Sequence, residues 1–452
     1  MNEKINICFV ANYSKTYLFI EIAKELIKEG YNIFWIVNTG KLYSLIRSSL
    51  GSNKEDILIL NKEIAKKNVE DFYEIQSNEL IYGDRSLKYY RDDWVQKYIR
   101  NIPGLSIKFI KENRIKYVVG ELTYPHEIIL SRLAPENEYV YLNPHPIRIP
   151  SGYFAFFHDE FQLKMAKRSS PLNTVPKIKL EKPFYFYINE SLIKEKMSFG
   201  GRIKRLKRFF TAENIEKDDP YMISKFSVRL KKGIKEEFNS FAYNLIKKRK
   251  IHDIKGKKLA LYALQKQPEA SVDVVGRYYE NQFINIINIW RILPFDWILC
   301  VKEHTNAIGD RSYNFFKKIT SYKNIVLIDE KEDSHKLIEL CDAIFTVSGT
   351  IAYEAAIKGK MAFTFVPTFF NKLKGCCRVT LDDLRNLHNI YELMEKNKEE
   401  DNHKFDLNEF EIFLSNYIYP GHVGDPLSYG KCLEKENIER IKNALSDVIL
   451  SK

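Results

Sequence analysis

The chain has 452 residues, of which 45% are hydrophobic and 29% are charged. This length allows two or three domains with their own cores, and 28 Tyr and 29 Phe argue against a disordered chain. The formal net charge of +12 favours anionic partners such as nucleotide sugars, acidic glycans or membrane surfaces. No nucleic-acid-binding motif accompanies this charge, so a nucleic-acid partner is not expected.

The first residues, MNEKINICFV, lack the basic flank and long apolar core of a signal peptide. No uninterrupted apolar run reaches the length of about 18 residues that a membrane-spanning helix needs. The six cysteines are scattered, without the paired spacing of a zinc site. We therefore expect a cytoplasmic protein with reduced thiols and without a metal site.

The chain opens with a predicted strand, helix and second strand. Residues 5–10 form an apolar run, residues 16–29 carry an apolar helical face that ends at Gly30, and residues 32–37 form another apolar run. The loop at residues 11–15 contains no glycine, so the dinucleotide fingerprint G-x-G-x-x-G is absent. This excludes a nicotinamide-dependent enzyme of the ordinary kind.

The rest of the first half is less regular. Further strands are predicted at 116–119 and 139–142, and the aromatic stretch 148–160 is predicted as a loop within an irregular insertion at about 145–225. Residues 227–250 are expected to form a helix, and the polar stretch 252–258 with Gly256 reads as a linker. The first domain is therefore expected to span 1–250.

Strands and helices alternate in the second half, which indicates a parallel sheet in a second domain at 251–430, followed by a terminal helix within 431–452. Ser334 is expected to cap the helix that ends near Cys341. The fold class is α/β, with two Rossmann-like domains whose parallel sheets face an inter-domain cleft. The expected strands are 259–264, 297–301, 324–328, 343–347 and 361–366, and the expected helices are 280–290, 312–320 and 351–358.

A small-residue turn, Ser348-Gly349-Thr350, lies between a predicted strand and a predicted helix. A helix N-terminus presents unpaired N–H groups that suit a phosphate, and glycine permits close approach of a ligand. Glu354, one turn further on, is placed to accept hydrogen bonds from ribose hydroxyls. The alternative is an ordinary turn in which Ser348 or Thr350 caps the helix.

Two other predicted strands also end in polar residues. Lys302 and His304 follow one strand, where they can contact a phosphate or a sugar and where the imidazole can act as an acid. Gln267 and Glu269 follow another, on a loop that Pro268 stiffens. Open α/β sheets bind ligands at the carboxyl ends of their strands, so these segments predict one shared site.

In the first domain, Glu121 stands just past a predicted strand and is the candidate base or nucleophile. Asp84 is the alternative catalytic carboxylate, and His145 and Arg148 are candidates for acceptor contacts. Any of these residues can instead belong to an ordinary surface loop, as can the rival acids Asp159 and Glu160.

A basic segment, GRIKRLKRFF, suits an acidic acceptor or an anionic membrane surface. The alternative is a solvated basic helix. The five basic residues are Arg202, Lys204, Arg205, Lys207 and Arg208.

The segments QPE (267–269), KEH (302–304) and SGTIAYEAAIKGK (348–360) resemble the capsule polysaccharide biosynthesis family, which includes the Kdo transferases of bacterial capsule export. Weaker similarity covers GDR (83–85), GE (120–121) and RIPSGYFAF (148–156). The resemblance implies a GT-B architecture with the donor, a CMP-activated sugar, held mainly by the second domain. It implies no cofactor beyond this donor and no metal. Here Gln267, Glu269 and His304 match donor-site positions, but Thr305 replaces the expected proline, which puts the donor in doubt.

Three hypotheses follow. The first is a glycosyltransferase that moves Kdo or another acidic sugar to a capsule, lipopolysaccharide or related surface glycan, at the inner face of the cell membrane. The second is a nucleotide-sugar 2-epimerase of the same fold, which needs no acceptor. The third is a non-catalytic scaffold in polysaccharide assembly.

Overall fold

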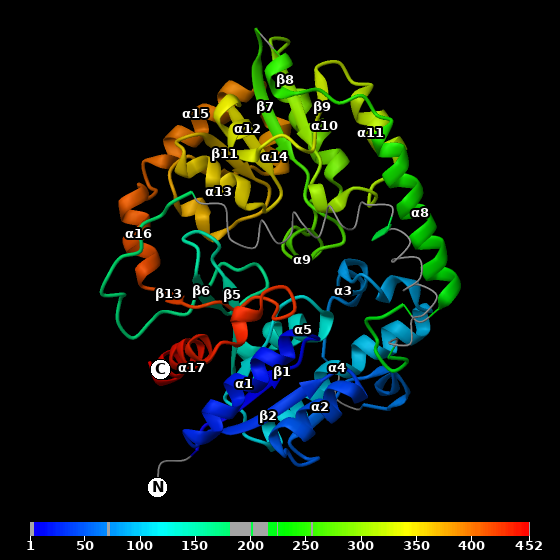
Figure 1. Cartoon of the computed structure of the whole chain (residues 1–452), viewed down its shortest axis with the longest axis vertical. Coiled ribbons are helices and arrows are strands. Elements are labelled where there is room, and N and C mark those ends of the chain that lie inside the picture. Colours follow the sequence, from blue (N-terminus) through cyan, green and yellow to red (C-terminus); the bar gives the residue numbers. More distant parts are fainter. Residues whose placement is uncertain are drawn as a thin grey trace. The chain divides into compact units, whose positions relative to one another are not determined.

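The computed structural model describes residues 4–69, 73–180, 200–201, 216–223, 225–254 and 256–451. The chain divides into two compact units, each with its own sheet (Figure 1). Unit 1 comprises Met1–Ser224 together with Glu411–Lys452, and unit 2 comprises Lys225–Phe410. These boundaries differ from the expected 1–250 and 251–430, because the C-terminal residues pack on the N-terminal helix and so return to unit 1.

Unit 1 is built on a seven-stranded sheet of order β13-β6-β5-β4-β1-β2-β3. Its first five strands in chain order pair in parallel, whereas β6 runs antiparallel to both of its neighbours. The strands are β1 (Asn6–Val10), β2 (Asn32–Val37), β3 (Ile57–Ile59), β4 (Tyr117–Val119), β5 (Val140–Pro146), β6 (Tyr153–Phe157) and β13 (Ile418–Pro420).

Helices bury both faces of this sheet. Ile7 and Phe9 of β1 belong to a core cluster with the first and the last α-helices of the chain, and the alternate residues Cys8 and Val10 are also fully buried. The α-helices are α1 (Lys15–Lys28), α2 (Gly40–Leu50), α3 (Ser77–Gly83), α4 (Asp92–Glu112), α5 (Pro125–Leu133) and α17 (Lys435–Leu450), and the short 3₁₀ helices are η1 (Lys62–Lys66), η2 (Leu87–Tyr89), η3 (Ala134–Glu136) and η7 (Gly430–Leu433).

The aromatic stretch that was expected to be a loop contains strand β6. Its residues Phe154, Ala155, Phe156 and Phe157 are almost completely buried, and β6 pairs with β5 on one side and β13 on the other. The loop prediction for 148–160 is therefore wrong over this strand. The apolar run resembles those of the other strands, but the turn residues Pro150, Ser151 and Gly152 directly before it are typical of a loop.

Unit 2 contains a six-stranded, fully parallel sheet of order β12-β11-β10-β7-β8-β9. The strands are β7 (Lys258–Ala263), β8 (Trp297–Lys302), β9 (Ile325–Ile328), β10 (Ala343–Thr346), β11 (Met361–Thr364) and β12 (Cys376–Arg378). The helices are α8 (Phe226–Asn244), η4 (Ile251–Asp253), α9 (Ala270–Asp273), α10 (Gln282–Ile292), η5 (Thr305–Ala307), α11 (Tyr313–Thr320), α12 (Ser334–Leu340), α13 (Thr350–Ile357), η6 (Phe369–Lys372), α14 (Leu381–Asn386) and α15 (Ile390–Asp401). Helix α16 (Leu407–Ser415) contains the boundary at which the chain returns to unit 1.

The predicted α/β class is confirmed, because each unit has a mainly parallel sheet with helices packed on it, as in a Rossmann-like domain. Two such units in one chain are the components of the GT-B architecture; the cleft between them stays a prediction. Two details are corrected. Helix α12 is capped by Asp333 rather than Ser334, and α8 ends at Asn244 because Arg249 joins the edge of β9 instead.

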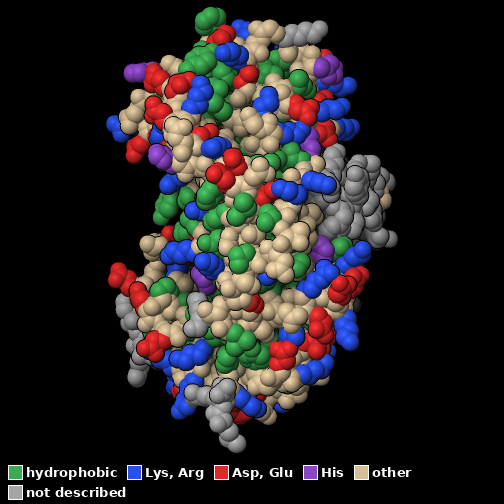
Figure 2. Space-filling view, turned by 90° about the vertical axis from the view of Figure 1, so that its left-hand side faces the viewer, with side chains coloured by type: hydrophobic (Ala, Val, Ile, Leu, Met, Phe, Trp, Pro, Cys, Tyr) green, Lys and Arg blue, Asp and Glu red, His purple; other side chains and the backbone are tan. Residues whose placement is uncertain are grey.

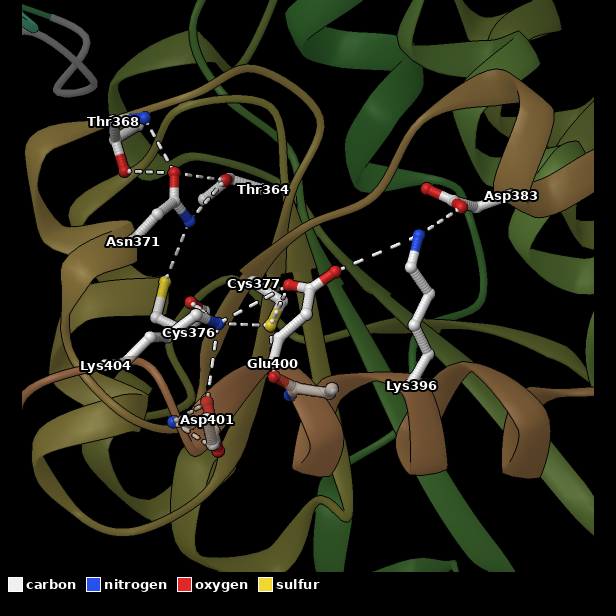
Figure 3. Close-up of polar contacts among 12 residues, drawn as sticks. Thr364, Thr368, Asn371, Cys376, Cys377, Asp383, Lys396, Glu400, Asp401 and Lys404 are labelled. Atoms are coloured by element: carbon white, nitrogen blue, oxygen red, sulfur yellow. Dashed lines mark hydrogen bonds and ion pairs between the residues drawn. The ribbon is translucent and has the colours of Figure 1, made fainter.

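All six cysteines are free and buried. On β12, Asn371 Nδ2 donates to Cys376 Sγ at 3.4 Å, while Lys404 Nζ lies 2.5 Å from Cys377 Sγ (Figure 3). Burial raises the pKa of both thiols, so they stay protonated at neutral pH. The two thiols have different partners, but Lys404 also donates to Cys376 O at 3.0 Å and so connects both residues.

Of the helices in the described part of the chain, none combines the length and apolar composition needed to cross a bilayer. The basic segment with Arg202, Lys204, Arg205, Lys207 and Arg208 lies outside the described residues.

Candidate functional site

The three polar segments singled out in the second half meet at one edge of the unit 2 sheet. Strand β7 pairs with β8 and with β10, so the residues that follow these three central strands emerge side by side. Leu264 N, just past β7, donates to Lys302 O at the end of β8. This is the carboxyl edge, where open α/β sheets hold their ligands.

Gln265 joins these strand ends. Its Oε1 accepts hydrogen bonds from Ser348 N (2.8 Å) and Thr346 Oγ1 (3.1 Å), and its Nε2 donates to Ser348 Oγ (3.2 Å). Its backbone exchanges two hydrogen bonds with the Gln282 amide and accepts a third from Arg311. Gln265 was not among the predicted site residues. The sequence feature that could have identified it is its position as the first polar residue after β7.

The turn Ser348-Gly349-Thr350 leads from β10 into α13. Ser348 is occupied by structural contacts, because its Oγ donates to Ser271 O at 2.6 Å and its backbone N–H binds Gln265. Gly349 has no room for a side chain, since a Cβ there would lie 2.6 Å from Thr346 Oγ1. The groups suited to a phosphate are therefore the backbone N–H groups that open α13.

Glu354 lies one turn into α13 and is held by two neighbours. Its carboxylate lies 3.5 Å from His335 Nε2 and accepts a 3.5 Å hydrogen bond from Thr350 Oγ1. The hydrogen bond to Glu354 raises the pKa of His335. The sequence did not indicate His335, since α12 and α13 bring the pair together through tertiary packing.

Lys302 and His304 flank a buried acid at the end of β8. Lys302 is only 9% exposed, and burial lowers its pKa against the opposing effect of Glu330 and Glu303. His304 is exposed, and its Nδ1 accepts a hydrogen bond from Asn306 N at 3.2 Å, which caps η5. In the neutral imidazole this contact leaves the proton on Nε2.

Glu303, between these two residues, is fully buried and pairs with Arg311 at 2.6 Å. Burial, only partly offset by Arg311, raises the pKa of Glu303 to about 7. Arg311 also donates to Gln265 O, so it connects the ends of β7 and β8. The buried Glu303–Arg311 ion pair therefore lies where the loops after β7 and β8 meet.

Gln267 and Glu269 shape the loop between β7 and α9. Gln267 Nε2 donates to Asp273 Oδ1 at 3.1 Å, and Gln267 Oε1 accepts from Gln282 Nε2 at 2.9 Å. Glu269 is the N-cap residue of α9 and is half-buried. The amide of Gln267 thus holds the loop. The role of Glu269 in ligand binding stays a prediction.

In unit 1, Glu121 follows β4 and forms an ion pair with Lys15 at 2.6 Å. Lys15 opens α1, and its side chain is buried whereas that of Glu121 is partly exposed. Gly120 is packed tightly here, because a Cβ would lie 2.6 Å from the Tyr141 hydroxyl. The catalytic role of Glu121 stays a prediction, now with a buried cation beside it.

A second carboxylate that the sequence did not single out lies near Glu121. Glu127, fully buried in the first turn of α5, accepts hydrogen bonds from Asn12 Nδ2, Thr123 N and Tyr124 N, each at 2.9 Å. Burial, and next the charge of Glu121, raise the pKa of Glu127 to about 7. Unit 1 therefore places two carboxyl groups close together, and Glu127 is the one that titrates near neutrality.

Asp84, Asp159 and Glu160 have structural contacts. Asp84 is buried, and its Oδ1 accepts from Ser86 N and Leu87 N at 2.7 Å. Asp159 accepts backbone N–H groups of the turn that follows it, and Glu160 pairs with Arg132 at 2.7 Å. These contacts give the three acids structural roles, and the catalytic role of Asp84 stays a prediction.

His145 lies in the last part of β5, and Arg148 follows two residues after this strand ends. His145 is partly buried, and burial, followed by the charge of Arg148, lowers its pKa to about 3. The imidazole is therefore neutral at physiological pH. Arg148 is exposed and has a positive φ of 68°, so it lies in a turn at the surface.

Replacing Glu127 by glutamine should change how stability depends on pH. Between about pH 4.5 and pH 7 the folded wild type holds a proton that the unfolded chain has released, so its free energy of unfolding falls as pH rises. The Glu127→Gln variant lacks this titration, and its amide can keep the three contacts if Asn12 turns its own amide over. Urea unfolding of both proteins at about pH 5 and pH 8 measures the effect. The prediction is contradicted if the free energy of unfolding of the wild type, relative to that of the variant, does not fall from pH 5 to pH 8.

Among the described residues, no group of three or more His, Cys, Asp or Glu side chains is arranged to hold a metal ion. No protein-family model matches the chain, and no curated protein matches it either.

Several solved structures resemble the chain at low sequence identity. A UDP-GlcNAc 2-epimerase from Neisseria meningitidis bound to UDP-GlcNAc is 12% identical, with all of both chains covered and a TM-score of 0.25. A UDP-GlcNAc 2-epimerase from Methanocaldococcus jannaschii in complex with UDP-GlcNAc and UDP is 15% identical over 98% of this chain and 99% of that one, with a TM-score of 0.28. KpsC, a beta Kdo 2,7 transferase from Thermosulfurimonas dismutans, is 11% identical over 76% of this chain and 89% of that one, with a TM-score of 0.35. Scores of this size carry no functional argument, and the α/β assignment rests on the two sheets themselves.

Proposed function

We propose that the chain is a glycosyltransferase that takes its sugar from a nucleotide-activated donor bound by unit 2. The observation that carries the proposal is the network in which Gln265 fixes the turn Ser348-Gly349-Thr350 at the carboxyl ends of β7, β8 and β10. A glycine-containing turn that opens a helix at this edge suits the phosphates of a nucleotide.

Within this proposal the N–H groups that open α13 bind the phosphates and Glu354 binds the ribose. Lys302 and His304 neutralise the leaving nucleotide, and Glu269 faces the base or the sugar. In unit 1 the Lys15–Glu121 pair supplies the base or nucleophile. Lys15 Nζ lies 2.6 Å from Glu121 Oε1 and fixes the position of this carboxyl group.

The finer proposal follows the resemblance to the capsule polysaccharide biosynthesis family. The donor is a CMP-activated sugar, Kdo or another acidic sugar, and the acceptor is a capsule, lipopolysaccharide or related surface glycan. The enzyme works in the cytoplasm, without a cofactor or a metal ion. The formal charge of +12 supports an anionic donor and an acidic acceptor.

A thermal-shift screen against CMP, UDP, GDP and CDP tests the donor site, since a ligand at about 100 times its Kd stabilises the folded state by about 2.7 kcal/mol. We expect CMP to raise the unfolding temperature of the unit 2 transition most. The reaction itself is tested by release of CMP from a CMP-sugar on addition of a glycan acceptor. Absence of both effects with all four nucleotides overturns the proposal.

A nucleotide-sugar 2-epimerase is the second candidate function. Glu127, with its pKa of about 7, lies near Glu121, and two neighbouring carboxyl groups are what proton abstraction and return would need. NMR of a UDP-sugar with enzyme alone separates the two, because only an epimerase converts it without an acceptor. A scaffold without catalysis would leave both assays silent and polysaccharide synthesis intact in cells with Glu121→Ala and His304→Ala.

A further inference from the structure

Helix α8 of unit 2 exposes an apolar stripe. Its four side chains are separated by four, three and four positions, which places them on one helical face. Their exposures, between 59% and 69%, are among the highest of the large apolar residues in the chain. The stripe consists of Ile234 (61%), Phe238 (65%), Phe241 (59%) and Leu245 (69%).

A different face of α8 attaches the helix to unit 2. Tyr243 is buried, with its ring 4.9 Å from that of Phe316 in α11 and its hydroxyl 3.3 Å from Glu330. Asn239 is also buried and donates to Gly309 O at 3.1 Å. The helix is therefore held in place through this second face, while the four side chains of the stripe stay largely exposed.

The charges around this stripe are strongly basic. Residues 225–250 contain nine Lys or Arg and only two Glu. Six of the basic residues are exposed, whereas Glu236 and Glu237 are half-buried. On the face of the molecule in Figure 2, acidic and basic side chains are intermixed instead. The exposed basic residues are Lys225, Lys231, Lys235, Lys247, Arg249 and Lys250.

The side chains of this surface indicate the kind of partner that would bind it. A stripe of Phe, Ile and Leu flanked by lysines matches helices that lie in the plane of a membrane surface. A second copy of α8 is disfavoured, because two such basic segments would repel each other. The 19 residues of α8 include too many charges to cross a bilayer, so the helix would lie along it.

We propose that α8 docks on an anionic lipid surface, with the stripe at the boundary between headgroups and acyl chains and the exposed lysines against lipid phosphates. This goes beyond the sugar chemistry proposed above, and it differs in place from the basic segment at 202–208. Docking would hold a donor-binding unit against a surface where lipid-linked acceptors are found.

Sedimentation of the full chain with vesicles tests the proposal. We expect binding to vesicles that contain phosphatidylglycerol and little binding to pure phosphatidylcholine, with affinity that falls as salt is raised. The Phe238→Ser/Phe241→Ser variant should bind at least about tenfold more weakly, because it lacks the two aromatic side chains that docking would bury in the lipid. Lys231→Glu/Lys235→Glu should also lose binding.

Phe295→Ser is the matched control, because Phe295 is 84% exposed but lies outside α8 and should leave binding unchanged. Nucleotide-induced thermal shifts should be the same in all these variants, so failure of docking and failure of the donor site give different results. Equal vesicle binding by the wild type and the Phe238→Ser/Phe241→Ser variant overturns the proposal. Absence of binding to phosphatidylglycerol vesicles at low salt also overturns it. This outcome includes the case in which an acidic protein, rather than a lipid surface, binds the stripe.

Discussion

The Gly349→Ala variant is expected to lose at least about tenfold in nucleotide affinity, which corresponds to about 1.4 kcal/mol. An added Cβ would lie 2.6 Å from Thr346 Oγ1, a short and buried side chain that cannot move away. The backbone of the turn must shift instead, and with it the N–H groups that open α13. Overpacking of this kind typically costs about 1–3 kcal/mol of stability as well.

Two further variants make this prediction specific. Gly359→Ala, at the other end of α13, meets nothing within 4 Å, so its cost is limited to its positive φ of 71° and should leave nucleotide binding unchanged. Thr346→Ala combined with Gly349→Ala removes the clashing oxygen and should regain part of the affinity. Isothermal titration with the nucleotide selected by the thermal-shift screen measures all three. Wild-type affinity in Gly349→Ala would contradict the assigned phosphate site.

The central strands of unit 2 and the turns that follow them were predictable, because buried parallel strands are short apolar runs that end in polar residues. The contacts among those turns were not. Gln265 and Ser348 are 83 positions apart, and only the pairing of β7 with β10 brings them together. Both Gln265 and Gln267 follow β7 in the sequence, and only the packing shows that Gln265 makes the contacts that join the strand ends.

Unit 1 was harder to predict for two physical reasons. Lys15 and Glu121 are 106 positions apart, so their ion pair depends on the fold rather than on a local pattern. The chain also returns to unit 1 near its end, where α17 packs on α1 through an apolar face that any amphipathic helix would show. The periodicity predicted the helix but could not identify its partner.

The second large effect is expected from Arg311→Met, which should lower the free energy of unfolding of unit 2 by about 3–5 kcal/mol at pH 8, the cost of leaving a buried charge without its partner. Glu303 is fully buried, and its Oε2 already has no hydrogen-bond partner. Arg311 is the cation that offsets the burial of this carboxyl group. The variant also loses the contact between Arg311 and Gln265 O.

The loss should depend on pH with a defined sign. The pKa of Glu303 in the folded protein, about 7, lies above its ordinary value and should rise further without Arg311. The folded state then keeps a proton that the unfolded state releases, so stability falls as pH rises through this range. Arg311→Met should therefore be closest to the wild type at acidic pH and weakest at about pH 8.

A double variant separates the buried charge from the lost packing. Glu303→Gln removes the charge but keeps an oxygen that accepts from His304 N, so Arg311→Met/Glu303→Gln should regain most of the loss at pH 8. Arg291→Met is the matched control, since this arginine is exposed, donates to Asn288 at 3.0 Å and should change stability little. Urea unfolding at pH 8 measures the free energy of unfolding of the three variants. If the single and the double variant are equally unstable, the unpaired carboxylate is not the cause, and the contact with Gln265 accounts for the loss.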